Sequence, residues 1–225
     1  MAGIIRIGLI GAGKRGTKLL NYLLFSDSVE IVAVCDVVLS AAEKAAKICA
    51  DSGRKTPSVY GGKKDSFKEL LNNENPDAVI ITTTWDSHAA IALHAMRNGI
   101  YPGIDVPAAL TVEDLWQLVE TSEETGIPFM MLENWSFRRD NLAVLNMIRA
   151  GLLGRIVHCH CAHSHECIGH WFFDKEGRDR WPAEYLVKRN ADQYPTHSLG
   201  PILQWMPDQR VTRVCCEGSG RHYVD

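Results

Sequence analysis

The chain has 225 residues, of which 46% are hydrophobic and 23% charged, with 24 Lys and Arg against 27 Asp and Glu. That hydrophobic fraction is ordinary for a globular protein and excludes wholesale disorder. The formal net charge of −3 argues against a protein that binds nucleic acid through a basic surface.

Strand-like and helix-like patterns alternate along the first part of the chain. They predict strands at Ile4–Ile10, Val29–Cys35, Asp77–Thr83, Ile100–Ile104 and Ile127–Leu132. Between these strands they predict helices at Lys14–Phe25, Ala41–Ala50, Asp65–Leu71, Ser87–Arg97 and Val112–Thr125. Thr111 followed three residues later by Asp114 is a capping pattern for the last helix. This alternation predicts an α/β domain with a doubly wound parallel sheet, covered by helices on both faces.

The pattern changes near residue 134, so we expect two domains, 1–134 and 135–225. The second is predicted to be a short α+β domain. We expect helices at Arg139–Ala150 and Leu199–Met206, strands at Arg155–His163 and Val211–Cys216, and a long irregular stretch at His165–Tyr194. A lone strand with a long loop buries little apolar surface. We therefore expect a shortened domain that is either part of a longer chain or completed by a second copy in a homo-oligomer.

The sequence also carries information about compartment. No run of roughly 18 apolar residues occurs, so we expect no transmembrane helix and no membrane partner. The apolar stretch Ile4–Ile10 is interrupted by Arg6 and followed by glycines, unlike the core of a secretory signal. The 7 cysteines are an odd number without framework spacing. These features predict a cytoplasmic protein with reduced thiols.

A glycine-rich turn carries the first functional signal. Gly11, Gly13 and Gly16 form G-x-G-x-x-G between a predicted strand and a predicted helix, and Asp36 ends the next strand. The first glycine permits a tight turn, the second lets the backbone approach a pyrophosphate, and the third lets helix pack on strand. Free N–H groups at the helix start favour phosphate. Asp36 would accept hydrogen bonds from ribose hydroxyls and repel a 2′-phosphate, so the pattern predicts NAD rather than NADP.

Two further segments resemble the Gfo/Idh/MocA oxidoreductase family, in which T-P-x-x-x-H and E-K-P follow two later strands. Here the segments are Thr83–His88 and Asp105–Pro107. The family proline is replaced by Thr84, and the lysine that assists proton transfer in ordinary family dehydrogenases is replaced by Val106. The resemblance implies a Rossmann domain followed by a substrate domain.

The chain is more similar to the NAD-dependent α-N-acetylgalactosaminidase branch of this family, which also has V-P in place of K-P. Separated matches occur in the same order at Trp85 and His88, Val106–Ala108, Glu133–Asn134, Arg138–Asp140, Leu145–Arg149 and Tyr194–His197. In that branch NAD accepts hydride from C3 of a sugar, a base removes the C2 proton, the C1 group is eliminated, water adds and the hydride returns. The resemblance implies a sugar or glycoside substrate.

The resemblance also implies roles for individual residues. The cofactor contacts would be the three glycines with Lys14, Arg15, Asp36, Trp85, His88, Asp105, Val106, Asn134 and Tyr194. The substrate contacts would be Tyr194, Pro195, Thr196 and His197. The branch's proposed C2 base, a tyrosine, falls on His163, and a substrate-binding arginine falls on Pro182. We therefore expect His163 and His197 as the acid/base pair.

Several alternatives stay open. The histidines and cysteines at 158–170 suit zinc by residue type. They lack a C-x-x-C pair and the family needs no metal, so we assign none and favour the wall of a substrate cleft. A conventional NAD-dependent sugar dehydrogenase or 3-oxidase is a second candidate, against which Val106 counts. A regulatory NAD-binding protein without turnover is a third.

Overall fold

The computed structural model describes residues 3–165, 168–174, 176–190 and 195–220. The chain divides into two compact units, Met1–Leu132 and Glu133–Asp225, which we call unit 1 and unit 2. No helix among the described residues is long and apolar enough to cross a membrane.

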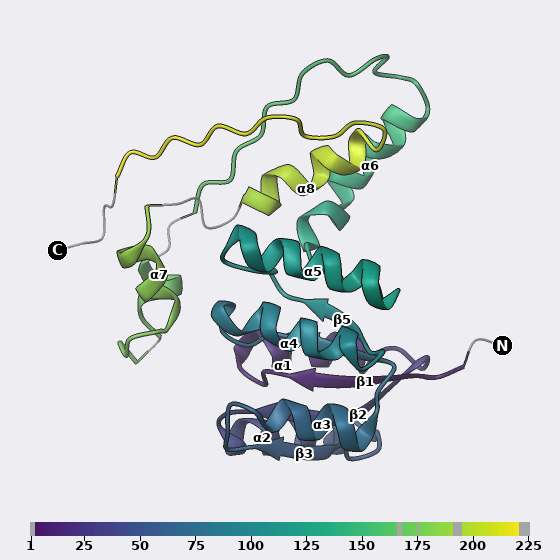
Figure 1. Cartoon of the computed structure of the whole chain (residues 1–225), viewed down its shortest axis with the longest axis vertical. Helices are drawn as coiled ribbons and strands as arrows, with labels where there is room; N and C mark the ends of the chain where they lie inside the picture. Colours follow the sequence, from purple (N-terminus) through teal and green to yellow (C-terminus); the bar gives the residue numbers. More distant parts are fainter. Residues whose placement is uncertain (1–2, 166–167, 175, 191–194, 221–225) are drawn as a thin grey trace. The chain divides into compact units, whose positions relative to one another are not determined.

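Unit 1 is built on one six-stranded sheet (Figure 1). Its strands are β1 (Ile5–Ile10), β2 (Val29–Asp36), β3 (Ser58–Gly61), β4 (Ala78–Ile81), β5 (Tyr101–Ile104) and β6 (Met130–Met131). They lie in the order β3-β2-β1-β4-β5-β6, and every neighbouring pair is parallel. The strand order reverses between β1 and β4, which is where open α/β sheets bind their ligands. The predicted doubly wound Rossmann architecture is confirmed.

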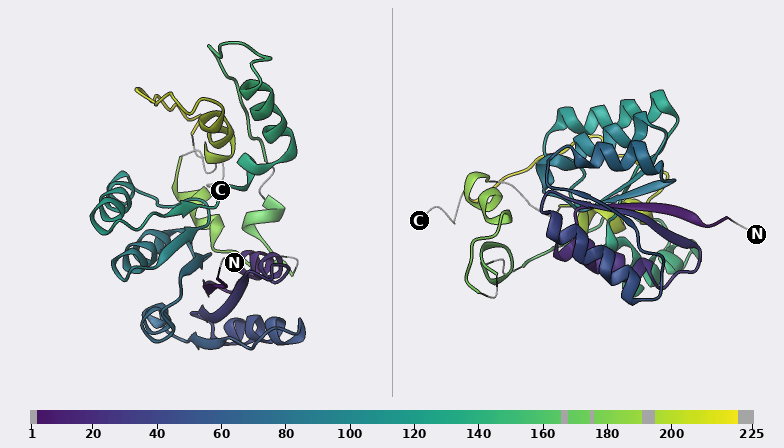
Figure 2. Two further views of the ribbon diagram at one scale, coloured as in Figure 1. Left: turned by 90° about the vertical axis from the view of Figure 1, so that its right-hand side faces the viewer. Right: turned by 90° about the horizontal axis from the view of Figure 1, so that it is seen from below.

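Helices cover both faces of this sheet (Figure 2). They are α1 (Lys14–Leu23), α2 (Leu39–Asp51), α3 (Ser66–Glu74), α4 (Trp85–Arg97) and α5 (Val112–Thr125). One apolar cluster joins α1 and α2 to β1 and β2, and a second joins α3, α4 and α5 to the other face. The predicted cap of α5 is confirmed, because the Thr111 hydroxyl accepts a hydrogen bond from the Asp114 N–H at 3.1 Å.

One element of unit 1, the strand β3, was not predicted from the sequence. It has only four residues, and its central Val59 is 38% exposed at the edge of the sheet. A short edge strand lacks both the continuous apolar run of a buried parallel strand and a clear alternation. Local pattern therefore gave no signal for it.

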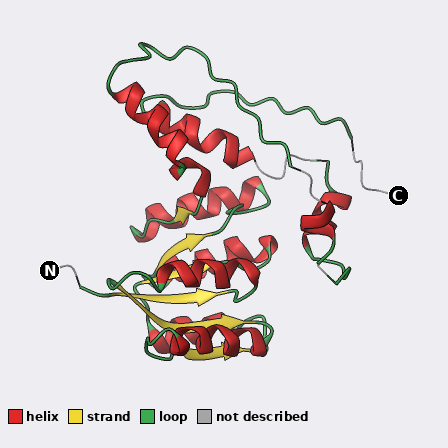
Figure 3. Cartoon of the chain, turned by 180° about the vertical axis from the view of Figure 1, so that it is seen from behind, coloured by secondary structure: helices red, strands yellow, loops and turns green. Residues whose placement is uncertain are grey.

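Unit 2 is mainly helical and irregular in its described residues (Figure 3). It contains the 3₁₀ helix η1 (Asn134–Phe137), α6 (Arg139–Arg149), the π-helical turn η2 (Ile168–Phe172), α7 (Pro182–Lys188) and α8 (Pro195–Trp205). The helix expected at Leu199–Met206 begins earlier, at Pro195. The stretch expected to be irregular holds α7, whose Pro182 stands at the first helical position, where proline fits well.

The strands expected at Arg155–His163 and Val211–Cys216 are wrong. Both stretches are extended, but neither pairs with another strand among the described residues. The one β-bridge of the described part of unit 2 joins Phe173 and Asp179. A strand exists only through its neighbour's hydrogen bonds, so an alternating pattern alone predicts backbone conformation and not pairing.

Candidate functional site

The glycine-rich turn of unit 1 is fixed by its neighbouring strands. The Gly11 N–H donates to the Cys35 carbonyl at 2.8 Å, and the Thr82 hydroxyl donates to the Gly11 carbonyl at 2.6 Å. Gly11 has φ +95°, and a Cβ there would overlap the Thr82 backbone. Only glycine fits this position without strain. The turn is thus clamped between the ends of β2 and β4.

Gly13 and Gly16 serve different physical purposes. A Cβ added at Gly13 would have no atom within 4 Å, so this part of the turn is open. A Cβ added at Gly16 would overlap the Gly11 carbonyl oxygen and lie 2.7 Å from the Thr82 hydroxyl. Gly16 therefore allows α1 to pack on the turn, whereas Gly13 leaves a backbone surface that another molecule can approach. This matches the division of roles that the motif predicts.

Asp36, at the end of β2, accepts hydrogen bonds from the backbone of the glycine-rich turn and of the residues that follow β2. Its Oδ2 accepts from the Ala12 N–H at 2.7 Å, and its Oδ1 accepts from the Val38 N–H at 2.8 Å. A carboxylate has about four acceptor positions, so each oxygen keeps capacity for a ribose hydroxyl. The contact from Ala12 joins positions 24 residues apart, so it depends on the folded turn and carries no local sequence signal.

This geometry sharpens a prediction about cofactor choice. The wild type should bind NAD more tightly than NADP by about ten- to a hundred-fold, because hydrogen bonds to a charged group contribute about 1.5 to 3 kcal/mol each and the carboxylate repels a 2′-phosphate. The double change Asp36→Ser with Val37→Arg should shift the preference toward NADP while lowering stability, since two backbone N–H groups lose their acceptor. Titration of both cofactors measures this. Asp51→Ser, an exposed carboxylate on α2, is the control, and equal affinity of the wild type for both cofactors would contradict the role of Asp36.

The carboxyl ends of β4 and β5 carry the next group of predicted residues. Arg15 donates from Nε to both oxygens of Asp105 at 3.1 Å and from its terminal nitrogen at 3.0 Å. His88 is 1% exposed, with Nδ1 2.7 Å from the Pro107 carbonyl oxygen and Nε2 3.1 Å from that of Thr83. Arg15 thus ties the start of α1 to the end of β5, and His88 ties two loops. Both side chains make their hydrogen bonds to other protein groups, which favours a role in positioning the loops over a direct contact with the cofactor.

Three more predicted cofactor residues lie in the same region of unit 1. Trp85 begins α4 and is 6% exposed, and Val106 follows β5 and is 5% exposed. Lys14, at the first position of α1, is exposed. Unit 1 therefore gathers the glycine turn, Asp36 and these residues at the carboxyl ends of its strands.

Unit 2 contains a compact cluster around one buried carboxylate. Glu133 is 6% exposed, and His197 of α8 donates from Nδ1 to its two oxygens at 2.7 and 2.8 Å. The same carboxylate accepts from the Trp135 N–H at 2.9 Å. The His197 ring stacks on the Trp135 indole with centroids 5.2 Å apart. The ring of His163 meets both edge-on, 4.7 Å from Trp135 and 5.1 Å from His197.

The structure thus brings the two predicted acid/base histidines together and adds Glu133. In the sequence, Glu133 stands out only as a position beside Asn134 that matches the family, with no role predicted for it. Its effect depends on His197, 64 residues away in the chain. Burial acts to raise the pKa of the Glu133 carboxyl, but the hydrogen bonds from His197 and from the Trp135 N–H outweigh burial and hold that pKa below its ordinary value.

A depressed pKa in the folded state makes stability depend on pH. The contribution of Glu133 is fully present above the ordinary glutamate pKa of about 4.3 and is lost as pH falls through the lower, folded value. Glu133→Gln should lower the free energy of unfolding by about 1 to 3 kcal/mol near neutral pH, and the difference from wild type should shrink on acidification below that range. Urea unfolding at several pH values measures it. Glu184→Gln, an exposed glutamate on α7, should change little; a gap that stays constant down to pH 3 would contradict the assignment.

The remaining predicted site residues of unit 2 are less informative. Asn134 begins η1 and is exposed. Pro195 and Thr196 begin α8 next to His197, and Tyr194 lies outside the described residues. His158, His160 and Cys161 are exposed, and no group of three or more potential metal ligands comes together in the described part of the chain.

Comparison with known proteins places both units. Residues 5–132 match the description "Oxidoreductase family, NAD-binding Rossmann fold" (GFO_IDH_MocA). The chain belongs to the Gfo/Idh/MocA oxidoreductase family. Residues 137–216 match "Glycosyl hydrolase 109, C-terminal domain". The resemblance inferred from the sequence motifs is confirmed, and with it NAD as the cofactor of the family's Rossmann domain.

Curated relatives match the chain across both units. The chain is 38% identical over 209 residues to a glycosyl hydrolase family 109 protein of Shewanella pealeana, and 38% identical over 210 residues to an α-N-acetylgalactosaminidase of Shewanella oneidensis. Each match covers 93% of this chain and 46% of the relative. The chain therefore spans less than half the length of these relatives.

Solved structures support the fold. A myo-inositol dehydrogenase from Lactobacillus casei, in complex with NAD(H) and myo-inositol, aligns with a TM-score of 0.59 at 23% identity, covering 67% of this chain and 43% of that one. GenD2 from gentamicin A biosynthesis, in complex with NAD, aligns with a TM-score of 0.56 at 16% identity, covering 68% of this chain and 41% of that one. At these identities the likeness shows the fold alone.

Proposed function

We propose that this chain carries the NAD-binding and acid/base parts of an enzyme that acts on a sugar or glycoside by transient oxidation at C3, with elimination and return of hydride. The observation that carries the proposal is the cluster of Glu133, His163 and His197. Both histidines lie in the stretch that matches the glycosyl hydrolase 109 C-terminal domain. The free thiols at the described cysteines and the need for NAD support a cytoplasmic enzyme.

The residues of unit 1 fit NAD. Gly13 leaves open backbone at the start of α1, where the first N–H groups of a helix have no partner within the helix. Those groups can donate to the pyrophosphate, and Asp36 can accept from the ribose. When bound, NAD supplies reversible acceptance of hydride from the substrate.

The residues of unit 2 fit the proton transfers. Because Glu133 engages Nδ1 of His197, we assign the proton exchange with the substrate to Nε2, the other nitrogen of that ring. The carboxylate also fixes the orientation of the imidazole ring. His163 takes the position of the branch's tyrosine and would remove the C2 proton. Trp135 holds both rings in place through its two ring contacts.

A conventional sugar dehydrogenase is the second candidate. Such family members place a proton-transferring lysine where this chain has Val106, a side chain that cannot exchange a proton and is buried here. The structure of unit 1 otherwise suits both enzymes equally, because both need the same NAD site. A binding protein without turnover would also share that site.

Product analysis separates the three functions. The purified chain with NAD and a panel of aryl glycosides should release the aglycone while the absorbance of NADH at 340 nm does not accumulate. Accumulation of NADH in proportion to oxidised sugar would favour the conventional dehydrogenase. NAD binding with neither product would overturn the enzymatic proposal and favour a binding protein.

A further inference from the structure

Helix α8 meets η1 closely at a position that carries no side chain. Gly200 follows His197 by three residues on α8, and residues three apart share a helix face. A Cβ added at Gly200 would lie 2.7 Å from the Ser136 Oγ and 3.0 Å from the Glu133 Cγ. Ser136 is 5% exposed and Glu133 6% exposed, so both side chains are enclosed by protein. The absence of a side chain at position 200 therefore sets how closely α8 approaches η1.

The contact between Glu133 and His197 depends on that approach. The Glu133 carboxylate accepts from the His197 Nδ1 at 2.7 and 2.8 Å and from the Trp135 N–H at 2.9 Å. The Cγ against which a Cβ at Gly200 would press belongs to this same side chain. A larger residue at position 200 must either move α8 outward, which carries the imidazole away, or turn the carboxylate out of line. Hydrogen bonds weaken steeply once they lose alignment, so either movement weakens the pair.

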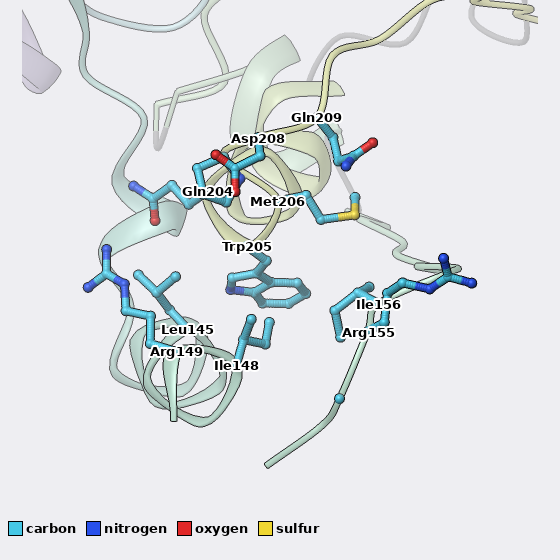
Figure 4. Close-up of a pocket in the computed structure, with 12 residues that line it drawn as sticks. Leu145, Ile148, Arg149, Arg155, Ile156, Gln204, Trp205, Met206, Asp208 and Gln209 are labelled. Atoms are coloured by element: carbon cyan, nitrogen blue, oxygen red, sulfur yellow. The ribbon is translucent and has the colours of Figure 1, made fainter. Parts of the chain in front are cut away.

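The far end of α8 is tied to the same cluster through Asn141. Trp205 ends α8 and donates from its indole Nε1 to the Asn141 carbonyl at 3.2 Å. The Asn141 side-chain amide donates to the Trp135 carbonyl at 2.7 Å. Figure 4 shows the Trp205 indole beside Leu145 and Ile148 of α6, which line the same pocket. Asn141 thus joins the end of α8 to the tryptophan on which the imidazole stacks.

We propose that Gly200 and Asn141 are positioning residues for the imidazole of His197. Gly200 sets the distance between α8 and Glu133. Asn141 fixes Trp135 relative to the end of α8. A group that exchanges a proton must lie within hydrogen-bond reach of its target, and a misplacement of ~1 Å can cost about a hundredfold in rate. The consequence for catalysis rests on the proposed function, whereas the contact itself can be measured without any substrate.

Proton NMR of the full chain tests the positioning directly. A proton shared between an imidazole Nδ1 and a carboxylate gives a strongly downfield signal, and His197→Gln assigns it by removing it. Gly200→Ala should abolish this signal. Alanine favours a helix interior more than glycine does, so the loss cannot come from a weakened helix. Adding Ser136→Ala removes the oxygen nearest the new methyl group and should restore the signal.

Leu199→Ala is the matched control for this measurement. It places alanine at the neighbouring position of α8, which is 41% exposed, and should leave the signal unchanged. An unchanged signal in Gly200→Ala, or an equal loss in Leu199→Ala, would overturn the role of Gly200. Circular dichroism and NAD titration show whether each variant folds.

Asn141→Ala provides a second variant that adds no bulk. It removes the amide that binds Trp135 and leaves the main-chain carbonyl for Trp205. With NAD and an aryl glycoside, Asn141→Ala and Gly200→Ala should each lower kcat at least tenfold, with KM and NAD affinity within twofold of wild type. Asn146→Ala, at an exposed asparagine of the same helix, should keep the wild-type kcat. Wild-type kcat in both positioning variants would overturn the proposal. A wild type without turnover, whose downfield signal is still lost in Gly200→Ala, would support the positioning and overturn only the proposed function.

Discussion

Gly16→Ala is expected to lower the free energy of unfolding by about 1 to 3 kcal/mol and to weaken NAD binding by at least tenfold. The added methyl group overlaps the Gly11 carbonyl oxygen and crowds the Thr82 hydroxyl. Neither neighbour can yield cheaply, because the Gly11 carbonyl is itself the acceptor of the Thr82 hydroxyl at 2.6 Å. Helix α1 must therefore shift away from the turn, and its free N–H groups leave their positions. Chemical unfolding and calorimetric titration with NAD measure the two effects.

Gly13→Ala is the matched change three residues earlier, and its effects on stability and binding should have opposite signs. Gly13 has φ −69° and ψ −168°, a conformation that alanine adopts, and no atom lies within 4 Å of the new Cβ. Alanine there should raise stability by about 0.4 to 1 kcal/mol through the unfolded state. NAD affinity should nevertheless fall at least tenfold, because the methyl group occupies the surface that the pyrophosphate approaches. Unchanged NAD affinity in this variant would show that the cofactor does not approach the backbone at Gly13.

The architecture of unit 1 could be predicted because its information is local. Each long buried strand is a continuous apolar run, each helix has an apolar face, and the turn motif stands between the two kinds of pattern. The contacts that make the turn work were not predictable in the same way. The bond from the Ala12 N–H to Asp36 and the bond from the Thr82 hydroxyl to Gly11 join positions 24 and 71 residues apart. The residue type shows that such a group can form a hydrogen bond, but only the folded structure shows which group is its partner.

Unit 2 was predicted less well because its elements depend on partners. Ile156–Ala162 and Val211–Cys216 have the composition of strands, yet pairing requires a neighbour at the correct spacing. The site shows the same division. His163 and His197 were found from their place in a resemblance, but their ring contacts through Trp135 and the buried carboxylate of Glu133 appear only in the structure.

His163→Ala is expected to reduce exchange of the substrate C2 proton with deuterated water by at least a hundred-fold, the lower range for loss of a general base. His163 is partly buried against Trp135 and His197, so alanine removes the proton acceptor without changing the glycine turn of unit 1. NAD affinity should therefore remain at the wild-type value. Deuterium in recovered glycoside, measured by mass spectrometry in the presence of NAD, gives the exchange rate.

Two further variants separate a base from a packing residue at this position. His158→Ala removes an exposed imidazole five residues earlier and should change exchange less than twofold. His163→Tyr restores the residue type of the related branch and should retain exchange with a changed pH profile, because a phenol titrates near pH ~10 and an imidazole near ~6.5. A packing role would instead make tyrosine and alanine equally active at every pH. Full exchange in His163→Ala would remove this histidine from the reaction and leave the Glu133–His197 pair as the remaining base.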